Sequence, residues 1–186
     1  MQPLHVIKEY STEKGVPICL HENKFFRMMF NGYFHYLDPI RYGRGVITVP
    51  RFANGDLILV RLRRAPALGF ALEFPRGGVE EGESLEDGAA RELLEETGYS
   101  ADLADVRCIG RVAADSATLN GATPVYWVPL QEGRAPGAFD TEEIDSVLRV
   151  SQAQFEEMVR QGEIFDGQTL AAWCLFRAQM LGYATK

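Results

Sequence analysis

The stretch GGVEEGESLEDGAARELLEETGY, residues 77–99, determines how the rest of this chain is interpreted. It opens with closely spaced glycines, and Gly77, Gly78 and Gly82 can adopt positive φ angles and let a phosphate approach the backbone. We therefore predict that the stretch begins as a glycine loop that can contact a phosphorylated ligand.

A helix is predicted to follow this loop. Ser84 is a favourable N-cap, and Gly98 is the expected left-handed residue after the last helical turn. Residues at a spacing of four form one face that can pack on a core, namely Leu85, Ala89, Leu93 and Thr97.

Another face of this helix carries three carboxylates, Glu92, Glu95 and Glu96. Like charges at these spacings destabilise a helix by roughly 0.2–0.5 kcal/mol per pair, and the helix dipole disfavours anions near the C-terminus. A divalent cation would reverse both effects, and hard oxygen ligands suit Mg²⁺ or Mn²⁺. From the helix alone, an ordinary solvated acidic face is an equal alternative.

The stretch resembles the Nudix box, a pattern of glycine, glutamate and arginine positions at fixed spacing. Every specified position is occupied here, by Gly77, Glu83, Arg91, Glu92, Leu93, Glu95, Glu96, Gly98 and Tyr99. The resemblance implies that Glu83 and Arg91 form an ion pair that holds the loop against the helix, and that Gly98 is structural.

The same resemblance implies a loop–helix–loop that binds Mg²⁺ or Mn²⁺ and hydrolyses a nucleoside diphosphate linked to another group. It implies that Glu92, Glu95 and Glu96 are the metal carboxylates, that Glu95 and Glu96 act in catalysis, and that the Arg76 carbonyl adds a ligand. A non-catalytic nucleotide sensor built on the same pocket is the alternative, because a fold alone does not fix a function.

Beyond the box, the chain is similar to the ADP-ribose and ADP-sugar pyrophosphatase branch of that family. This similarity implies substrate contacts by Arg64 and Glu73. The backbone at Gly77 and Gly78 is expected to contact substrate because glycine lets a phosphate approach closely. The branch commonly has Ala where Arg76 stands, so GDP-mannose, NADH, diadenosine polyphosphates and coenzyme A remain open as substrates. An arginine cluster occupies residues 61–64. From the residues alone, this cluster can either bind a phosphate or form the charged end of a strand.

A general base is still needed to activate water. The similarity to this branch implies that the base lies in the loop before the last strand, at Glu142 with Glu143 as the alternative. Both follow a stretch that contains glycine and proline and could move over a substrate. Solvated loop acids are the competing interpretation.

The composition excludes several classes of function. A net charge of −7 argues against binding of nucleic acid or of an anionic membrane. No apolar run reaches the roughly 20 residues of a spanning helix. The cysteines, Cys19, Cys108 and Cys174, form no paired motif, so we expect mostly buried, reduced thiols in a cytoplasmic protein.

The order of expected elements is strands, a helix, more strands and two helices, which indicates an α/β fold of the mixed α+β kind. Turns are expected at Asn31-Gly32 and Asn54-Gly55, and the last helix is expected to bury a stripe through Trp173 and Cys174. The resemblance implies a Nudix-type α/β/α sandwich over residues 43–186.

Residues 1–42 are predicted to form a small antiparallel β segment with more aromatic side chains than it can bury. Relatives of the resembled branch are dimers in which this segment reaches the partner's site. From the residues alone, the segment can pack on the main domain as an extra layer of the same core or on a second copy of the chain. The resemblance favours the second copy, so we expect a homodimer. The substrate is expected to be a nucleotide small molecule.

Overall fold

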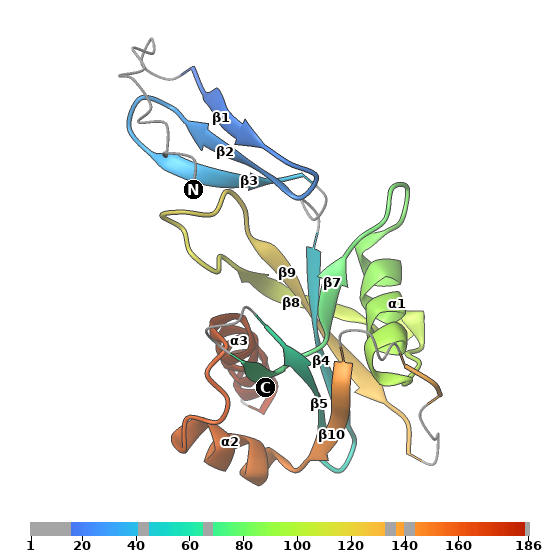
Figure 1. The fold of residues 1–186 in the computed structure, drawn as a ribbon. Helices are drawn as coiled ribbons and strands as arrows, with labels where there is room; N and C mark the ends of the chain where they lie inside the picture. Colours follow the sequence, from blue (N-terminus) through green and yellow to red (C-terminus); the bar gives the residue numbers. More distant parts are fainter. Residues whose placement is uncertain (1–15, 41–44, 65–68, 133–136, 140–143, 185–186) are drawn as a thin grey trace. The chain divides into compact units, whose positions relative to one another are not determined.

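The computed structural model describes residues 16–40, 45–64, 69–132, 137–139 and 144–184, with side chains up to residue 180. These residues form two compact units, one of residues 16–40 with Asp115–Gly121 and one of the remaining described residues. Figure 1 shows the elements of both units.

The smaller unit is an antiparallel sheet of β1 (Ile18–Glu22), β2 (Phe26–Phe30) and β3 (His35–Pro39). The predicted turn at Asn31-Gly32 joins β2 to β3, and Gly32 has a φ of 87°. The segment Asp115–Gly121 joins this sheet, because the Leu37 N–H donates to the Thr118 carbonyl oxygen at 2.7 Å. The predicted antiparallel β segment is therefore present in the described residues.

The larger unit is built on a mixed sheet of seven strands among the described residues, in the order β10-β5-β4-β9-β8, with β6 on β5 and β7 on β4. Only the β4–β9 pair is parallel in this part of the chain. The strands are β4 (Gly45–Phe52), β5 (Leu57–Arg63), β6 (Phe70–Glu73), β7 (Arg76–Gly78), β8 (Arg107–Val112), β9 (Thr123–Leu130) and β10 (Ile144–Val150).

Helices cover both faces of this sheet (Figure 1). The helix α1 (Leu85–Thr97) packs Ala89 and Leu93 against one face, with Ile58 in the same cluster. The helices α2 (Gln152–Arg160) and α3 (Gly167–Ala184) pack against the other face, where Leu57 and Leu59 lie. The short 3-10 helix η1 spans Leu103–Asp105. The predicted α/β/α sandwich is thus confirmed, with β5 buried on both faces.

Local signals placed the helix ends correctly. Ser84 caps α1 by accepting the Asp87 N–H, and Gly98 ends α1 with a φ of 72°. Ser151 caps α2 in a capping box with Gln154. Both ends of α1 are set by residues within one turn of the helix, which explains why the sequence could locate them.

The predicted glycine loop at Gly77 and Gly78 is wrong. Both residues lie in β7, which pairs antiparallel with β4 at Val46 and Gly45, and neither has a positive φ. Gly82 does have a φ of 83°, so the true loop begins later. The need for glycine at residue 77 is instead steric, as described below.

The predicted burial of the cysteines is also wrong, because Cys19, Cys108 and Cys174 are all free and exposed. Among the side chains of α3 that the structure describes, the buried ones are Thr169, Ala172 and Phe176, not the stripe through Cys174. The cause lies in tertiary packing, since Phe176 stacks on Trp173 and contacts the sheet side chain Trp127.

Candidate active site

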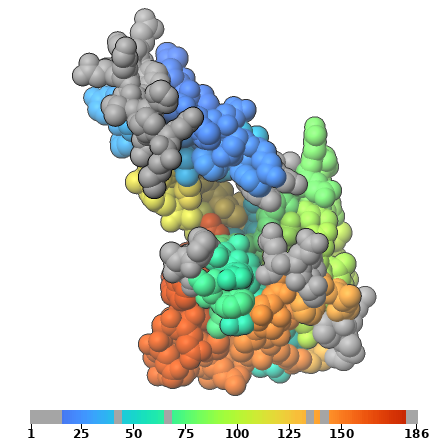
Figure 2. All heavy atoms as spheres, viewed as in Figure 1, coloured from blue at the N-terminus to red at the C-terminus, as the bar shows by residue number. Residues whose placement is uncertain are grey.

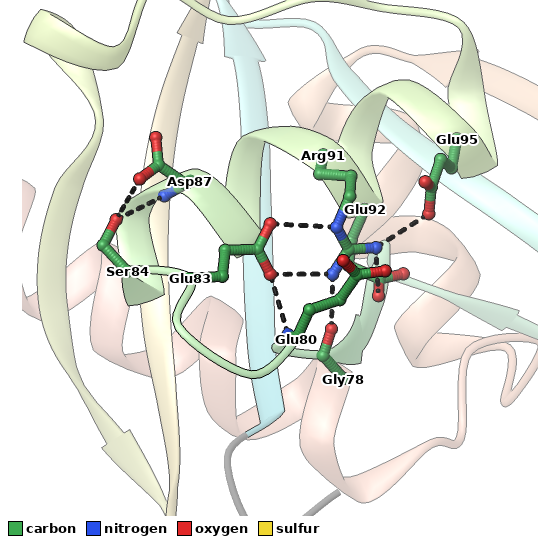
Figure 3. A network of polar contacts seen from close by, with 8 residues as sticks. All are labelled: Gly78, Glu80, Glu83, Ser84, Asp87, Arg91, Glu92 and Glu95. Carbon is green, nitrogen blue, oxygen red and sulfur yellow. Dashed lines mark hydrogen bonds and ion pairs between the residues drawn. The ribbon is translucent and has the colours of Figure 1, made fainter.

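Arg91 on α1 is the centre of the polar network drawn in Figure 3. Its guanidinium donates to both carboxylate oxygens of Glu83, at 2.9 and 3.0 Å, and to the carbonyl oxygen of Gly78 at 2.6 Å. The pKa of Glu83 is lowered chiefly by this pairing with Arg91. Arg91 thus connects the loop after β7 to the helix, as the predicted ion pair requires.

Arg91 also contacts two of the three candidate metal carboxylates. Its Nη1 atom lies 3.0 Å from Glu92 Oε1 and 2.8 Å from Glu95 Oε2. The Glu95 side chain is 52% exposed, whereas Glu92 is only 13% exposed. Glu92 and Glu95 therefore pair with the same Arg91 guanidinium, but Glu95 is much more accessible to water than Glu92.

Glu92 lies directly against β7. A Cβ atom placed on Gly77 would be 2.1 Å from both Cδ and Oε2 of Glu92, so no side chain fits at residue 77 while Glu92 keeps this position. Burial raises the pKa of the Glu92 carboxyl. Gly77 therefore provides the space in which a desolvated carboxylate is held.

Glu96 is the most enclosed of the three carboxylates. Its Oε2 atom accepts the backbone N–H of Arg76 at 3.0 Å, which fixes it to the start of β7. Burial raises the pKa of Glu96 to about 8, and the charge of nearby Glu92 adds to the shift. Without a cation, this carboxyl favours its protonated form near neutral pH.

The donor chemistry of this face fits a hard divalent cation. Glu92 and Glu96 bring carboxylate oxygens into a desolvated region, where a positive charge would stabilise their ionised forms. Within the part of the chain that the structure describes, however, no three His, Cys, Asp or Glu side chains are already gathered as a metal site. Arg91 contacts both Glu92 and Glu95, so these two carboxylates are paired with its guanidinium.

Glu73, at the end of β6, holds a pair of arginines. Arg64 donates to both of its oxygens, at 2.8 and 2.5 Å, and Arg76 Nη2 lies 2.7 Å from Oε2. The Glu73 side chain is 2% exposed, while that of Arg64 is 31% exposed. Arg64 can therefore reach a ligand, whereas the carboxylate of Glu73 is occupied by the two guanidinium groups.

The structure brings in residues that sequence analysis did not assign to the site. Asp166 and Gln168, at the start of α3, accept hydrogen bonds from Nη1 of Arg76. Asp166 also accepts the Thr169 N–H in the manner of an N-cap, and that capping pattern was visible in the sequence. Their contact with Arg76, some ninety residues away, was not.

The region where β6 meets the start of α3 is visible on the surface of the molecule. In Figure 2 the teal-green atoms around β6 lie beside the orange-red atoms of the C-terminal helices. A hydrogen bond joins the two segments, because the Phe74 N–H donates to Thr169 Oγ1 at 3.1 Å. The start of α3 is thus fixed to the strand that leads into Arg76.

Glu142 and Glu143, the candidate bases, lie outside the described residues. The nearby described residue Gly137 donates its N–H to the Gly98 carbonyl oxygen at 2.7 Å. A Cβ on Gly98 would come within 2.3 Å of the Gly137 carbonyl oxygen. Gly98 therefore ends α1 and also allows the close approach of the segment around residue 137.

A model of the NUDIX domain matches residues 41–172 of this chain. The ADP-sugar pyrophosphatase of Mus musculus is 43% identical over 74 residues, which are 40% of this chain and 33% of that protein. The ADP-ribose pyrophosphatase of Bacillus subtilis (strain 168) is 27% identical over 146 residues, 76% of each chain. The chain thus spans about a third of the length of its mouse relative.

A solved structure described as an ADP compounds hydrolase has the same fold. It aligns with a TM-score of 0.73 over 94% of this chain and 98% of its own, at 19% sequence identity. Among the described residues of the present chain, no helix is both long and apolar enough to cross a membrane.

Proposed function

This chain belongs to the NUDIX domain family, and on that premise we propose that it hydrolyses the diphosphate bond of a nucleoside diphosphate linked to another group. The names of the mouse and Bacillus subtilis relatives support an ADP-sugar or ADP-ribose as that substrate. The products would be a nucleoside monophosphate and a phosphorylated remainder.

The observation that carries this proposal is the pair of desolvated carboxylates on one face of α1. Glu92 lies beside Gly77 and accepts a hydrogen bond from Arg91, and Glu96 accepts the Arg76 N–H, so the protein fixes the position of both carboxylates. Burial raises the pKa of both groups, and perturbed carboxylates of this kind cluster at functional sites.

We propose that Glu92 and Glu96 hold Mg²⁺ or Mn²⁺, with Glu95 and the Arg76 carbonyl as further ligands. A bound cation would neutralise diphosphate oxygens and lower the pKa of a water molecule. Glu95 would have to exchange its contact with Arg91 for the cation, and its 52% exposed side chain leaves it room to do so.

Arg64 is proposed to bind the substrate phosphates. A guanidinium has five N–H groups. Arg64 uses two of its N–H groups to donate to Glu73. The remaining edge suits phosphate oxygens, which guanidinium groups bind in a bidentate manner. Glu73 would then act on the substrate through Arg64, because its own oxygens are occupied.

The reaction needs water to attack one phosphorus atom while the bridging P–O bond of the diphosphate breaks. The proton lost by the water must pass to a base, for which we propose Glu142 with Glu143 as the alternative. The Gly137–Gly98 contact supports this choice, because it brings the segment a few residues before Glu142 to the C-terminal end of α1. Glu96 occupies the last turn of the same helix.

A homodimer is also proposed. Three aromatic side chains of the smaller unit are exposed, namely Phe25, Tyr33 and Phe34. Exposed aromatic surface of this kind is typical of protein interfaces. We further propose a reducing, cytoplasmic location, which the free, exposed cysteines support.

The test is a panel of nucleotide substrates incubated with the purified protein. We expect release of a nucleoside monophosphate from ADP-ribose or an ADP-sugar in the presence of Mg²⁺ or Mn²⁺, and none with EDTA. GDP-mannose, NADH, diadenosine polyphosphates and coenzyme A belong in the panel as competing substrates. Tight nucleotide binding without hydrolysis of any of them would favour a sensor instead.

A further inference from the structure

The side chain of Arg76 joins two parts of the larger unit. Its Nη2 atom lies 2.7 Å from Glu73 Oε2 at the end of β6. Its Nη1 atom lies 3.3 Å from Asp166 Oδ2 and also donates to Gln168 Oε1, both at the start of α3. The side chain is 20% exposed, so most of this guanidinium faces protein.

The backbone of the same residue contacts the candidate metal site. The Arg76 N–H donates to Glu96 Oε2 at 3.0 Å. The backbone of Arg76 is paired with Ile47 of β4, and three acceptors hold its side chain, so the residue is fixed at both ends beside the Glu96 carboxylate. Arg76 therefore links Glu73 at the end of β6, the start of α3 and Glu96 through its own contacts.

Arg76 also shares an acceptor with Arg64. The Nη2 atoms of the two arginines lie 2.5 and 2.7 Å from the single oxygen Oε2 of Glu73. Two cations meeting at one buried oxygen fix each other's positions, since each limits where that carboxylate can rotate. Removal of Arg76 would leave Arg64 as the one guanidinium described on Oε2 of Glu73, so the Glu73–Arg64 pair would gain freedom to move.

We propose that Arg76 is a positioning residue that holds Glu96 through its backbone and Arg64 through Glu73, so that the cation-binding and phosphate-binding groups keep one relative geometry. Its contacts with Glu73, Asp166 and Gln168 occupy the side chain, so it acts through these neighbours and not on the substrate. This inference rests on the proposed function, which assigns Glu96 to the cation and Arg64 to phosphate.

The first measurement is Mn²⁺ binding by calorimetry, without any substrate. Loss of a group that orients a metal ligand typically weakens metal affinity by about 10- to 100-fold, and we expect Arg76→Ala to fall in that range. Arg76→Lys should lie between Arg76→Ala and wild type, because an ammonium keeps the charge but cannot span all three acceptors.

The second measurement is steady-state kinetics on the nucleotide that the wild-type protein hydrolyses best. Arg76→Ala should lower kcat through Glu96 and raise KM through Arg64. In an Arg64→Ala background, Arg76→Ala should raise KM no further, because two residues that act through one contact are not additive.

Arg149→Ala is the matched control. Arg149 also contacts two carboxylates, Asp56 and Glu132, but none of the residues assigned to the site. We expect it to keep wild-type Mn²⁺ affinity, kcat and KM. Arg76→Ala and Arg76→Lys proteins that do the same, whatever their melting temperatures, would overturn the positioning role.

Failure of the proposed function is distinguishable from failure of this inference. A wild-type protein that binds Mn²⁺ but hydrolyses nothing would contradict the hydrolase, while the calorimetric comparison would still decide the role of Arg76. If Arg76→Ala does not fold, Arg76→Lys carries the comparison, and wild-type Mn²⁺ affinity in that variant would overturn the proposal.

Discussion

The carboxylate of Glu92 occupies the space that a side chain at Gly77 would need, with only 2.1 Å between a Cβ atom at residue 77 and the Glu92 carboxyl carbon. Glu92 is on α1 and Gly77 is in β7, so this contact joins the helix to the strand at the proposed metal site. The backbone of Gly77 does not have a positive φ, so its conformation alone would not require glycine. The space taken by Glu92 is the steric reason for glycine at residue 77.

Gly77→Ala should therefore impair function more than stability. The added methyl group would displace the carboxylate, which is the flexible end of a side chain, and the backbone of β7 could stay in place. We expect at least about tenfold weaker Mn²⁺ binding with a nearly unchanged melting temperature. Gly167→Ala is the control, since a Cβ there meets nothing within 4 Å. Equal Mn²⁺ affinity in the two variants would contradict the steric account.

Glu96→Gln should change how stability depends on pH in the absence of a cation. Burial raises the pKa of Glu96 from 4.5 to about 8, so the folded state binds this proton more tightly than the unfolded state. The contribution to stability is complete below pH 4.5 and is lost as the pH rises through about 8. Glutamine carries no such proton.

Melting temperatures measured in EDTA test this prediction. The wild-type protein should lose stability relative to Glu96→Gln as the pH rises between 4.5 and about 8. Parallel curves for the two proteins over this window would show that Glu96 is not desolvated. Saturating Mg²⁺ should stabilise the wild type and not the variant, because a cation that binds the folded state raises its stability.

Arg91→Ala should destabilise the fold as well as reduce activity. The substitution removes donors from Glu83, Glu92 and the Gly78 carbonyl. Hydrogen bonds to charged groups contribute roughly 1.5–3 kcal/mol, and we expect a loss of that size in urea denaturation. Arg160→Ala, which removes a 71% exposed arginine paired with Glu157, should change stability by less than about 1 kcal/mol. Similar losses in both variants would argue against a structural role for Arg91.

The features that the sequence predicted are the local ones. The Ser84 cap, the Gly98 stop and the turn at Asn31-Gly32 depend on neighbouring residues, and the carboxylate face of α1 depends only on helical spacing. The order of elements indicated a mixed α/β fold, whereas the α/β/α layers were expected only from the resemblance to the Nudix box.

The features that it missed depend on distant partners. Gly77 forms a strand because Val46 pairs with it, and no residue near Gly77 signals this. Asp166 and Gln168 reach Arg76 only once α3 is folded onto the strand that ends at Glu73. The pairing of Glu73 with both Arg64 and Arg76 is another such long-range feature, and the predicted contact of Glu73 with substrate stays a prediction.

Glu142→Gln tests the proposed general base. A general base typically raises the reaction rate by about 10²- to 10⁴-fold. We therefore expect kcat to fall by a factor in that range, with Mn²⁺ affinity and melting temperature unchanged. Glu143→Gln is the neighbouring control and should retain most of kcat. If Glu143→Gln is the impaired variant, the base is Glu143. Nearly full kcat in both would place the base elsewhere.

The most direct test of the central claim is the rate of nucleoside monophosphate release from ADP-ribose and an ADP-sugar, measured against Mg²⁺ concentration for wild type and Glu96→Gln side by side. We predict a rate that rises with Mg²⁺ and saturates in the wild type, and little or none at any Mg²⁺ concentration in a folded Glu96→Gln protein. Near-normal, Mg²⁺-dependent turnover by the variant would contradict the assignment of Glu96 as the carboxylate that holds the catalytic cation.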